Sequence, residues 1–245
     1  MSKPISLLEY KEPHLSNILL IIASGFIECI AYMLCFQIFA SFMTGTIIIG
    51  VVEFATKSSM SNITLLRVAS IGFAFIGGIV SLFYIRYKIY KKSDNNYIFT
   101  QMLIFQSILL IIFTAFVFFM MYFNMSHNII AILVVLVLSF NMGFHHHHLG
   151  IKYKGMIYRT HFMTFNTWNM FNLIVKYRVL PLDKRKSSEG IELKKKSRFF
   201  LLVLVIFFSA VLVCAEFIPY LSFYILIVPA LLFVFAAYFS KGKEV

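Results

Sequence analysis

The side chains most able to do chemistry in this chain are a carboxylate, a run of four histidines and two threonine-containing motifs, all set in apolar sequence. The carboxylate, Glu28, lies inside an apolar stretch over residues 17–40. An ionisable group inside a membrane-crossing helix is costly and by default belongs to a functional site. Glu28 is therefore a candidate proton or cation site, and the alternative is a structural hydrogen bond to a neighbouring helix.

The run of four histidines begins at His145. Consecutive residues of a helix are about 100° apart, so only His145 and His148 share a face and the run cannot bind one metal ion by itself. Imidazole binds zinc, copper, nickel, iron and haem iron and titrates near neutral pH, so metal binding, proton or substrate handling, and a plain interfacial position all stay open. The candidate metal ligands are His145, His146, His148 and His161, with Glu28 as a carboxylate partner, and the sequence identifies no cofactor.

The threonine motifs are Met43-Thr44-Gly45-Thr46 and Met163-Thr164-Phe165-Asn166. The first lies within residues 17–56, which contain no charged loop and are about twice as long as the ~20 residues of a lipid-crossing helix. We therefore expect a span over residues 17–40, a break at Thr44-Gly45-Thr46 and a shorter half-helix that re-enters the membrane. Non-helical backbone at membrane depth is tolerated only where protein or water surrounds it, which makes the break a candidate site.

The first turn of a half-helix exposes backbone N–H groups that favour an anion or a polar oxygen. Thr44 and Thr164 can cap the two half-helices. Phe165, which occupies the position of Gly45 in the second motif, narrows the space beside the second half-helix. The alternative is a pair of capped helix ends that only stabilise the fold. The candidate substrate-binding residues are Glu28, Thr44, Gly45, Thr46, Thr164 and Asn166.

Composition sets the class of the protein, because 60% of residues are hydrophobic, 13% are charged and 29 of 245 are Phe. A soluble domain of this size does not need so much apolar surface, so we predict an all-α membrane protein with one integral membrane domain over residues 1–245. Cys29, Cys35 and Cys214 lie in apolar segments, which argues against a disulfide framework or a zinc module. The sequence contains no nucleophile–base pair, phosphate-binding loop or metalloprotease motif, so we expect no enzyme.

Six membrane spans are expected, at about residues 17–40, 65–87 and 97–121, from 129 onward, and at 199–218 and 221–240. All of the 22 Lys and Arg residues except Lys57 and Arg67 fall on one side of this arrangement. The positive-inside rule then places both termini and the basic loop 176–198 in the cytoplasm, with the chain in the cell inner membrane. The expected partners are the lipid bilayer and a small solute or ion, a homo-oligomer is left open, and nucleic acid is excluded.

The two halves of the chain match each other in order and spacing. The matching pairs are Gly25-Phe26-Ile27-Glu28-Cys29 with Gly143-Phe144-His145-His146-His147, and Met43-Thr44-Gly45-Thr46 with Met163-Thr164-Phe165-Asn166. These motifs divide the chain into a first repeat, 17–121, and a second repeat, 129–240. Because each repeat has three full crossings, the second runs upside down relative to the first. Inverted repeats with broken helices are a transporter architecture.

Small residues recur at every fourth position in the second span, at Ser70, Ala74 and Gly78. Side chains at this spacing form a stripe along one face of a helix. A stripe of small residues lets another helix approach closely, so we expect this face to be a packing surface.

The same motifs resemble those of the YoaK-type bacterial membrane proteins, a six-span family of unassigned function. That family shows Gly-x-x-Asp-Ala, Met-Thr-Gly-Asn, Gly-x-Gln-Asn-Ala and an Arg-Thr-Thr that leads to a second Met-Thr-Gly. Here Glu28 replaces the Asp, His145 and His146 replace Gln-Asn, and Phe165 replaces the second glycine. The resemblance covers nearly the whole chain and implies the six-span fold, but it implies no established activity.

These observations favour a carrier or channel for a small solute or ion, with its site between the two broken helices. One alternative is a non-transporting membrane protein that binds metal or haem through the histidine run. Another is a partner-binding structural membrane protein, suggested by the basic loop.

The orientation can be tested without knowing the function. Single cysteines at Lys184 and Asn124, on a background without the native cysteines, are treated with a membrane-impermeant thiol reagent in intact cells. We expect labelling at position 124 only, because the positive-inside rule places Lys184 in the cytoplasm. Labelling at position 184 in intact cells would refute the orientation, and labelling of both positions in lysed cells is the control.

Overall fold

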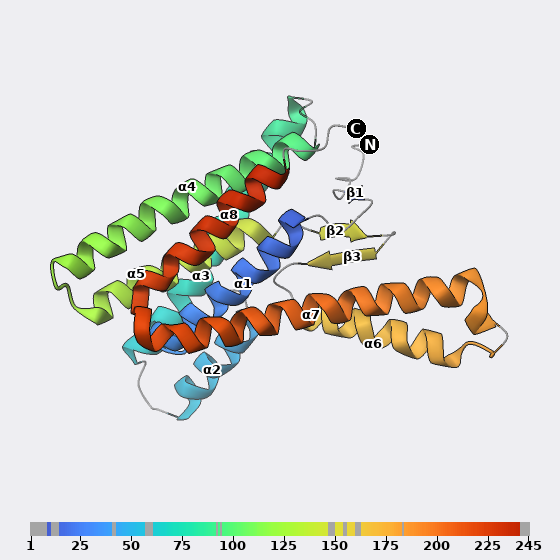
Figure 1. Cartoon of the computed structure of the whole chain (residues 1–245). Helices are drawn as coiled ribbons and strands as arrows, with labels where there is room; N and C mark the ends of the chain where they lie inside the picture. The colour runs from blue at the N-terminus through green and yellow to red at the C-terminus, as the bar shows by residue number, and fades with distance from the viewer. Residues whose placement is uncertain are drawn as a thin grey trace.

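The computed structural model of the chain describes residues 9–10, 15–40, 43–56, 61–91, 93, 95–146, 150–153, 156–159, 163–182 and 184–240 (Figure 1). The α-helices are α1 (Leu15–Leu34), α2 (Met43–Thr56), α3 (Asn62–Tyr90), α4 (Asn95–Tyr122), α5 (His127–His146), α6 (Met163–Val179), α7 (Ser188–Leu221) and α8 (Ile227–Ser240). Two 3₁₀ helices, η1 (Lys184–Lys186) and η2 (Ser222–Leu226), adjoin α7. The strands are β1 (Glu9–Tyr10), β2 (Gly150–Tyr153) and β3 (Met156–Arg159).

Long apolar helices confirm the prediction of a helical membrane protein. Within the described residues, five segments are long and apolar enough to cross a membrane. They are Leu15–Leu34, Asn62–Lys88, Tyr97–Tyr122, His127–His145 and Ser188–Ser240. The last of them contains α7, η2 and α8, where the chain reverses direction (Figure 1).

Helices α4 and α8 run antiparallel and define the two ends of the bundle. The hydroxyls of Thr100 and Ser240 lie 2.9 Å apart at one end, and the rings of Phe118 and Tyr224 lie 4.8 Å apart at the other. Exposed tyrosines gather at both ends: Tyr87, Tyr90, Tyr97 and Tyr238 at the first, and Tyr122, Tyr220 and Tyr224 at the second. Such aromatic belts mark the two headgroup regions of a membrane.

The closest helix pair is α3 with α5, and glycines allow the contact. A Cβ added to Gly77 would lie 2.1 Å from the carbonyl oxygen of Phe140, and one added to Gly143 would lie 1.9 Å from that of Ala74. Ser70, Ala74 and Gly78 are all buried. The expected packing role of the small-residue stripe is therefore confirmed.

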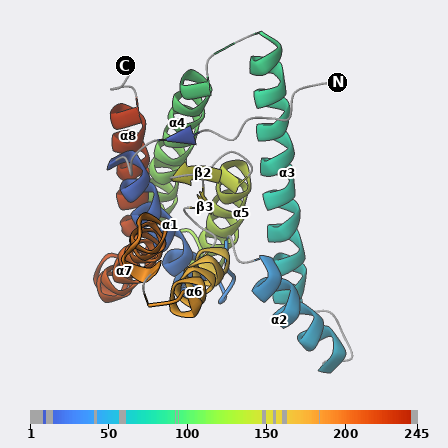
Figure 2. The same cartoon turned by 90° about the vertical axis from the view of Figure 1, so that its right-hand side faces the viewer.

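A second close contact joins α1 to α7. A Cβ on Gly25 would lie 2.9 Å from the Cβ of Ala210 and 2.9 Å from the carbonyl oxygen of Phe207. Helix α1 also packs along α8, and Figure 2 shows α1, α7 and α8 on one side of the molecule and α3 on the other. Helix α1 thus packs on α7, as α5 packs on α3.

The first span ends six residues earlier than expected, at Leu34 instead of residue 40. Phe36 and Gln37 adopt left-handed backbone conformations, with φ of 59° and 57°, and these end the helix. Stacking of Tyr32 on Phe39, with centroids 5.0 Å apart, and burial of Ile38 help to offset that cost. The break therefore precedes the Thr44-Gly45-Thr46 motif, which lies in the first turn of α2.

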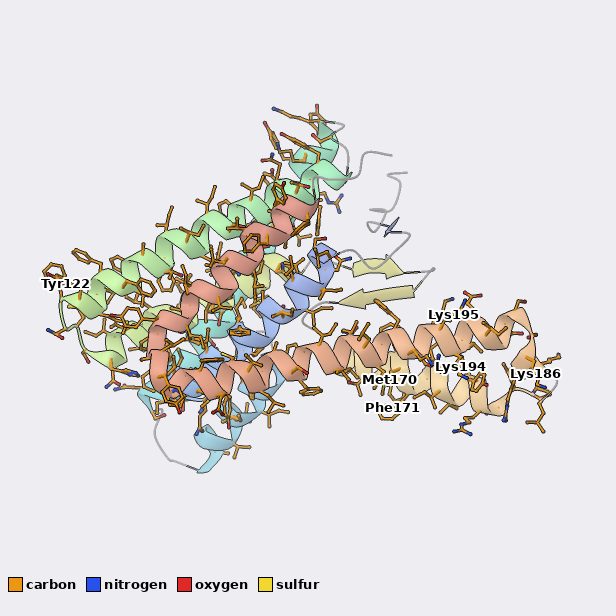
Figure 3. The ribbon with its side chains drawn as sticks, viewed as in Figure 1. Tyr122, Met170, Phe171, Lys186, Lys194 and Lys195 are labelled. Atoms are coloured by element: carbon orange, nitrogen blue, oxygen red, sulfur yellow. The ribbon has the colours of Figure 1, made fainter. Side chains whose placement is uncertain are left out.

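The basic segment 176–198, predicted as a loop, is mostly helical. Helix α6 continues to Val179 and α7 begins at Ser188, so that the two helices form a hairpin that leaves the bundle (Figure 1). The guanidinium of Arg185 donates to the carbonyls of Leu180 and Arg178 at the end of α6, where the helix dipole favours a cation. Figure 3 shows Lys186 at the tip of the hairpin and Tyr122 at the opposite extreme of the molecule.

A small sheet adds strands that the all-α prediction did not include. Strand β1 pairs in parallel with β2, and β2 pairs antiparallel with β3. The strands are only two to four residues long, too short to show a clear alternating pattern in the sequence. The sheet joins the segment before α1 to the segment after α5.

The glycine contact of α3 and α5 can be tested with matched variants on one helix. Gly77→Ala should lower the unfolding free energy by about 2–3 kcal/mol, because its Cβ would overlap the backbone of Phe140. Gly72→Ala should be neutral or stabilising by up to about 1 kcal/mol, since a Cβ there meets nothing within 4 Å. Thermal unfolding in detergent measures both, and equal unfolding temperatures would contradict the contact.

Candidate functional site

The structure buries the carboxylate expected to be functional. Glu28 lies on α1, one turn after Gly25, and is 3% exposed. It is therefore close to the α1–α7 contact made by Gly25. A carboxyl group at such a position must be neutral or paired, because hydrocarbon does not solvate a charge.

The first turns of α2 and α6 each bury a polar side chain. Thr46 in α2 is 1% exposed and Asn166 in α6 is 0% exposed. The hydroxyl of Thr46 donates to the carbonyl of Phe39, at 3.3 Å, in the broken segment before the helix. Thr46 and Asn166 occupy the same position of the two matched motifs, so α2 and α6 both begin with a buried polar group.

The side chains of Thr44 and Thr164 lie outside the described residues, as do His148, His161 and the side chain of His146, and Gly45 is described only as part of α2. The approach of Thr44 to Thr164 therefore stays a prediction, and so does the metal site of the histidine run. Within the part of the chain that the structure describes, no three His, Cys, Asp or Glu side chains are placed to hold a metal ion together.

His145 belongs to a buried polar network that the sequence analysis did not identify. The amide nitrogen of Gln106 on α4 donates to the side-chain oxygen of Asn141, at 3.2 Å, and to its backbone carbonyl, at 3.1 Å. The amide oxygen of Gln106 lies 3.1 Å from Nδ1 of His145, one turn further along α5. The ring of His145 packs edge-on against Phe233 of α8, so the network joins α4, α5 and α8.

The hydrogen-bond pattern fixes the tautomer of His145. The amide oxygen of Gln106 can only accept, so Nδ1 of His145 carries a proton and Nε2 is the acceptor nitrogen of the neutral ring. Nδ2 of Asn141 is a buried donor with no hydrogen-bond partner among the described residues. A buried donor of this kind marks a place where a water molecule or a polar ligand can be held.

Arg67 is a second residue whose importance the sequence analysis missed. It lies in the second turn of α3, inside an apolar span, and is 4% exposed. An arginine inside an apolar span is itself a signal of a buried polar site. Gln106 gave the same signal, as an amide in the middle of an apolar span.

Comparison with known proteins gives one family and no relative of known function. A family model described as "Protein of unknown function (DUF1275)" matches residues 17–239. No curated protein matches the chain, and no solved structure does. The match spans nearly all of the chain, in agreement with the extent of the resemblance to the YoaK-type proteins.

The polar network predicts a non-additive pair of substitutions. Gln106→Leu should cost about 1–3 kcal/mol of unfolding free energy, because it leaves Nδ1–H of His145 buried without its acceptor. Adding His145→Phe should recover the part of that loss that comes from the buried Nδ1–H, whereas Oδ1 of Asn141 still lacks its donor. Chemical denaturation in detergent measures both variants, and additive losses would show that the two side chains are not coupled.

Proposed function

The chain belongs to the family described as "Protein of unknown function (DUF1275)", and we propose that this member is a membrane carrier or channel for a small polar solute or ion. The observation that carries the proposal is the pair of buried polar residues, Thr46 and Asn166, in the first turns of two short helices. Helix beginnings present unpaired N–H groups and a partial positive charge. Broken helices use these ends to bind solutes inside transporters.

The packing of the two halves supports their arrangement as inverted repeats. Gly25 and Gly143 occupy matched positions, and each packs closely against an alanine on the third helix of the other half, Ala210 or Ala74. Helix α2 lies against the beginning of α3, whereas α6 leaves the bundle at the opposite, basic end (Figures 1 and 2). Two half-helices that exit at opposite ends are what an inverted repeat requires.

The buried ionisable groups suggest what the site would handle. Glu28 on α1 and His145 on α5 both lie near the glycine contacts of their helices, and both side chains are buried. A carboxyl group and an imidazole can each bind or release a proton, so a cation, or a solute moved together with protons, fits these side chains best.

Uptake by proteoliposomes tests the proposal with variants on one helix. A panel of monovalent cations and small neutral solutes is screened first with the unmodified protein. Asn166→Leu should then reduce uptake about tenfold, because the loss of one buried hydrogen bond to the solute costs about 1.4 kcal/mol. Asn172→Leu, on the exposed side of α6, is the matched control and should transport normally.

Two results would contradict the proposal. The first is a flux that never exceeds that of protein-free liposomes for any member of the panel. The second is an Asn166→Leu variant that transports as fast as the Asn172→Leu control.

A further inference from the structure

Three sulfur-containing side chains, those of Cys29, Met33 and Cys214, lie where α1 crosses α7, and the proposed transport site does not use them. The thiol of Cys29 lies 3.7 Å from the thioether sulfur of Met33, one turn further along α1. The thiol of Cys214, on α7, lies near enough to that of Cys29 for the two groups to interact. The Cys214 sulfur also lies 3.7 Å from the carbonyl oxygen of Phe26.

The position of the sulfurs follows from the glycine contact. Gly25 brings the backbones of α1 and α7 together at Ala210, and Cys29 and Cys214 each lie one turn further along their own helices. Both cysteines are buried and neither forms a disulfide. Met33 is 47% exposed, so its flexible side chain connects the buried thiols with the surface.

We propose that Cys29, Met33 and Cys214 form a binding site for monovalent copper. Thiolate and thioether ligands are soft and select Cu(I) over hard cations. With metal–sulfur bonds of about 2.3 Å, a trigonal site has sulfur–sulfur separations of about 4 Å. The 3.7 Å between Cys29 and Met33 is already close to that value.

Binding of Cu(I) changes the charge of the site. Because the thiolate is the form of cysteine that ligates a metal ion, Cu(I) replaces the thiol protons of Cys29 and Cys214, and both protons leave to solvent. Two thiolates and one thioether around a monovalent cation leave one net negative charge. Zinc is disfavoured because its structural sites take four ligands, whereas the proposed site supplies three.

The site goes beyond the proposed transport function, since its ligands differ from Thr46 and Asn166. It joins the first helix of one half to the third helix of the other. Bound copper would therefore stabilise the contact between α1 and α7, as any ligand that binds only the folded state does.

Anaerobic titration of the reduced, detergent-solubilised full-length protein with Cu(I), in competition with a chromogenic Cu(I) chelator, tests the proposal. We expect one tightly bound copper per chain, an X-ray absorption spectrum with sulfur neighbours only, and a higher unfolding temperature. Cys29→Ser and Cys214→Ser should abolish binding, because hydroxyls are poor ligands for Cu(I). Met33→Leu should weaken it at least about tenfold, since the site then keeps two strong ligands.

Cys35→Ser is the matched control, since Cys35 is equally buried but lies in the broken segment after α1. It should bind copper like the unmodified protein. Copper that stays wholly with the chelator would overturn the proposal. Copper binding that survives both serine variants, but is lost when the histidines from His145 to His148 are replaced, would overturn it as well. A Cys29–Cys214 disulfide that forms in air in a protein that binds no copper when reduced would also overturn it.

Discussion

Backbone hydrogen bonding inside a hydrocarbon layer is the constraint on which this structure depends. No water is present there to pair with N–H and C=O groups, so the chain crosses as helices and keeps its irregular segments covered by protein. The segment after α1 obeys this rule, because Cys35, Ile38 and Ala40 are buried although none of them is helical. The bundle thus buries these three residues of the broken segment, while Gln37 is exposed.

The same constraint explains why glycines decide the helix contacts. Between helices in lipid the hydrophobic effect gives little driving force, so association relies on close van der Waals packing. Gly25, Gly77 and Gly143 each let a backbone approach where no Cβ would fit. These contacts set the relative positions of Glu28 and His145, which lie within one turn of Gly25 and Gly143 on α1 and α5.

Polar groups in this bundle are few, and several are concentrated on its inner faces. Gln106, Asn141 and His145 form one polar network between α4 and α5. Thr46 and Asn166 are buried in the first turns of α2 and α6. Arg67 is buried within an apolar span. Because each of these groups costs free energy to bury in lipid, their presence together is hard to explain by packing alone.

The sequence alone was enough to predict the class of the protein, its long apolar helices, a short helix after the first span and the small-residue packing face, because length, hydropathy and residue spacing are local properties. It did not predict the end of α1 at Leu34, since two left-handed residues are stabilised there by distant packing. Only the tertiary structure brought Gln106 to His145 and Cys29 to Cys214. Those pairs join residues far apart in the chain, and helix crossings, not sequence patterns, decide which side chains meet.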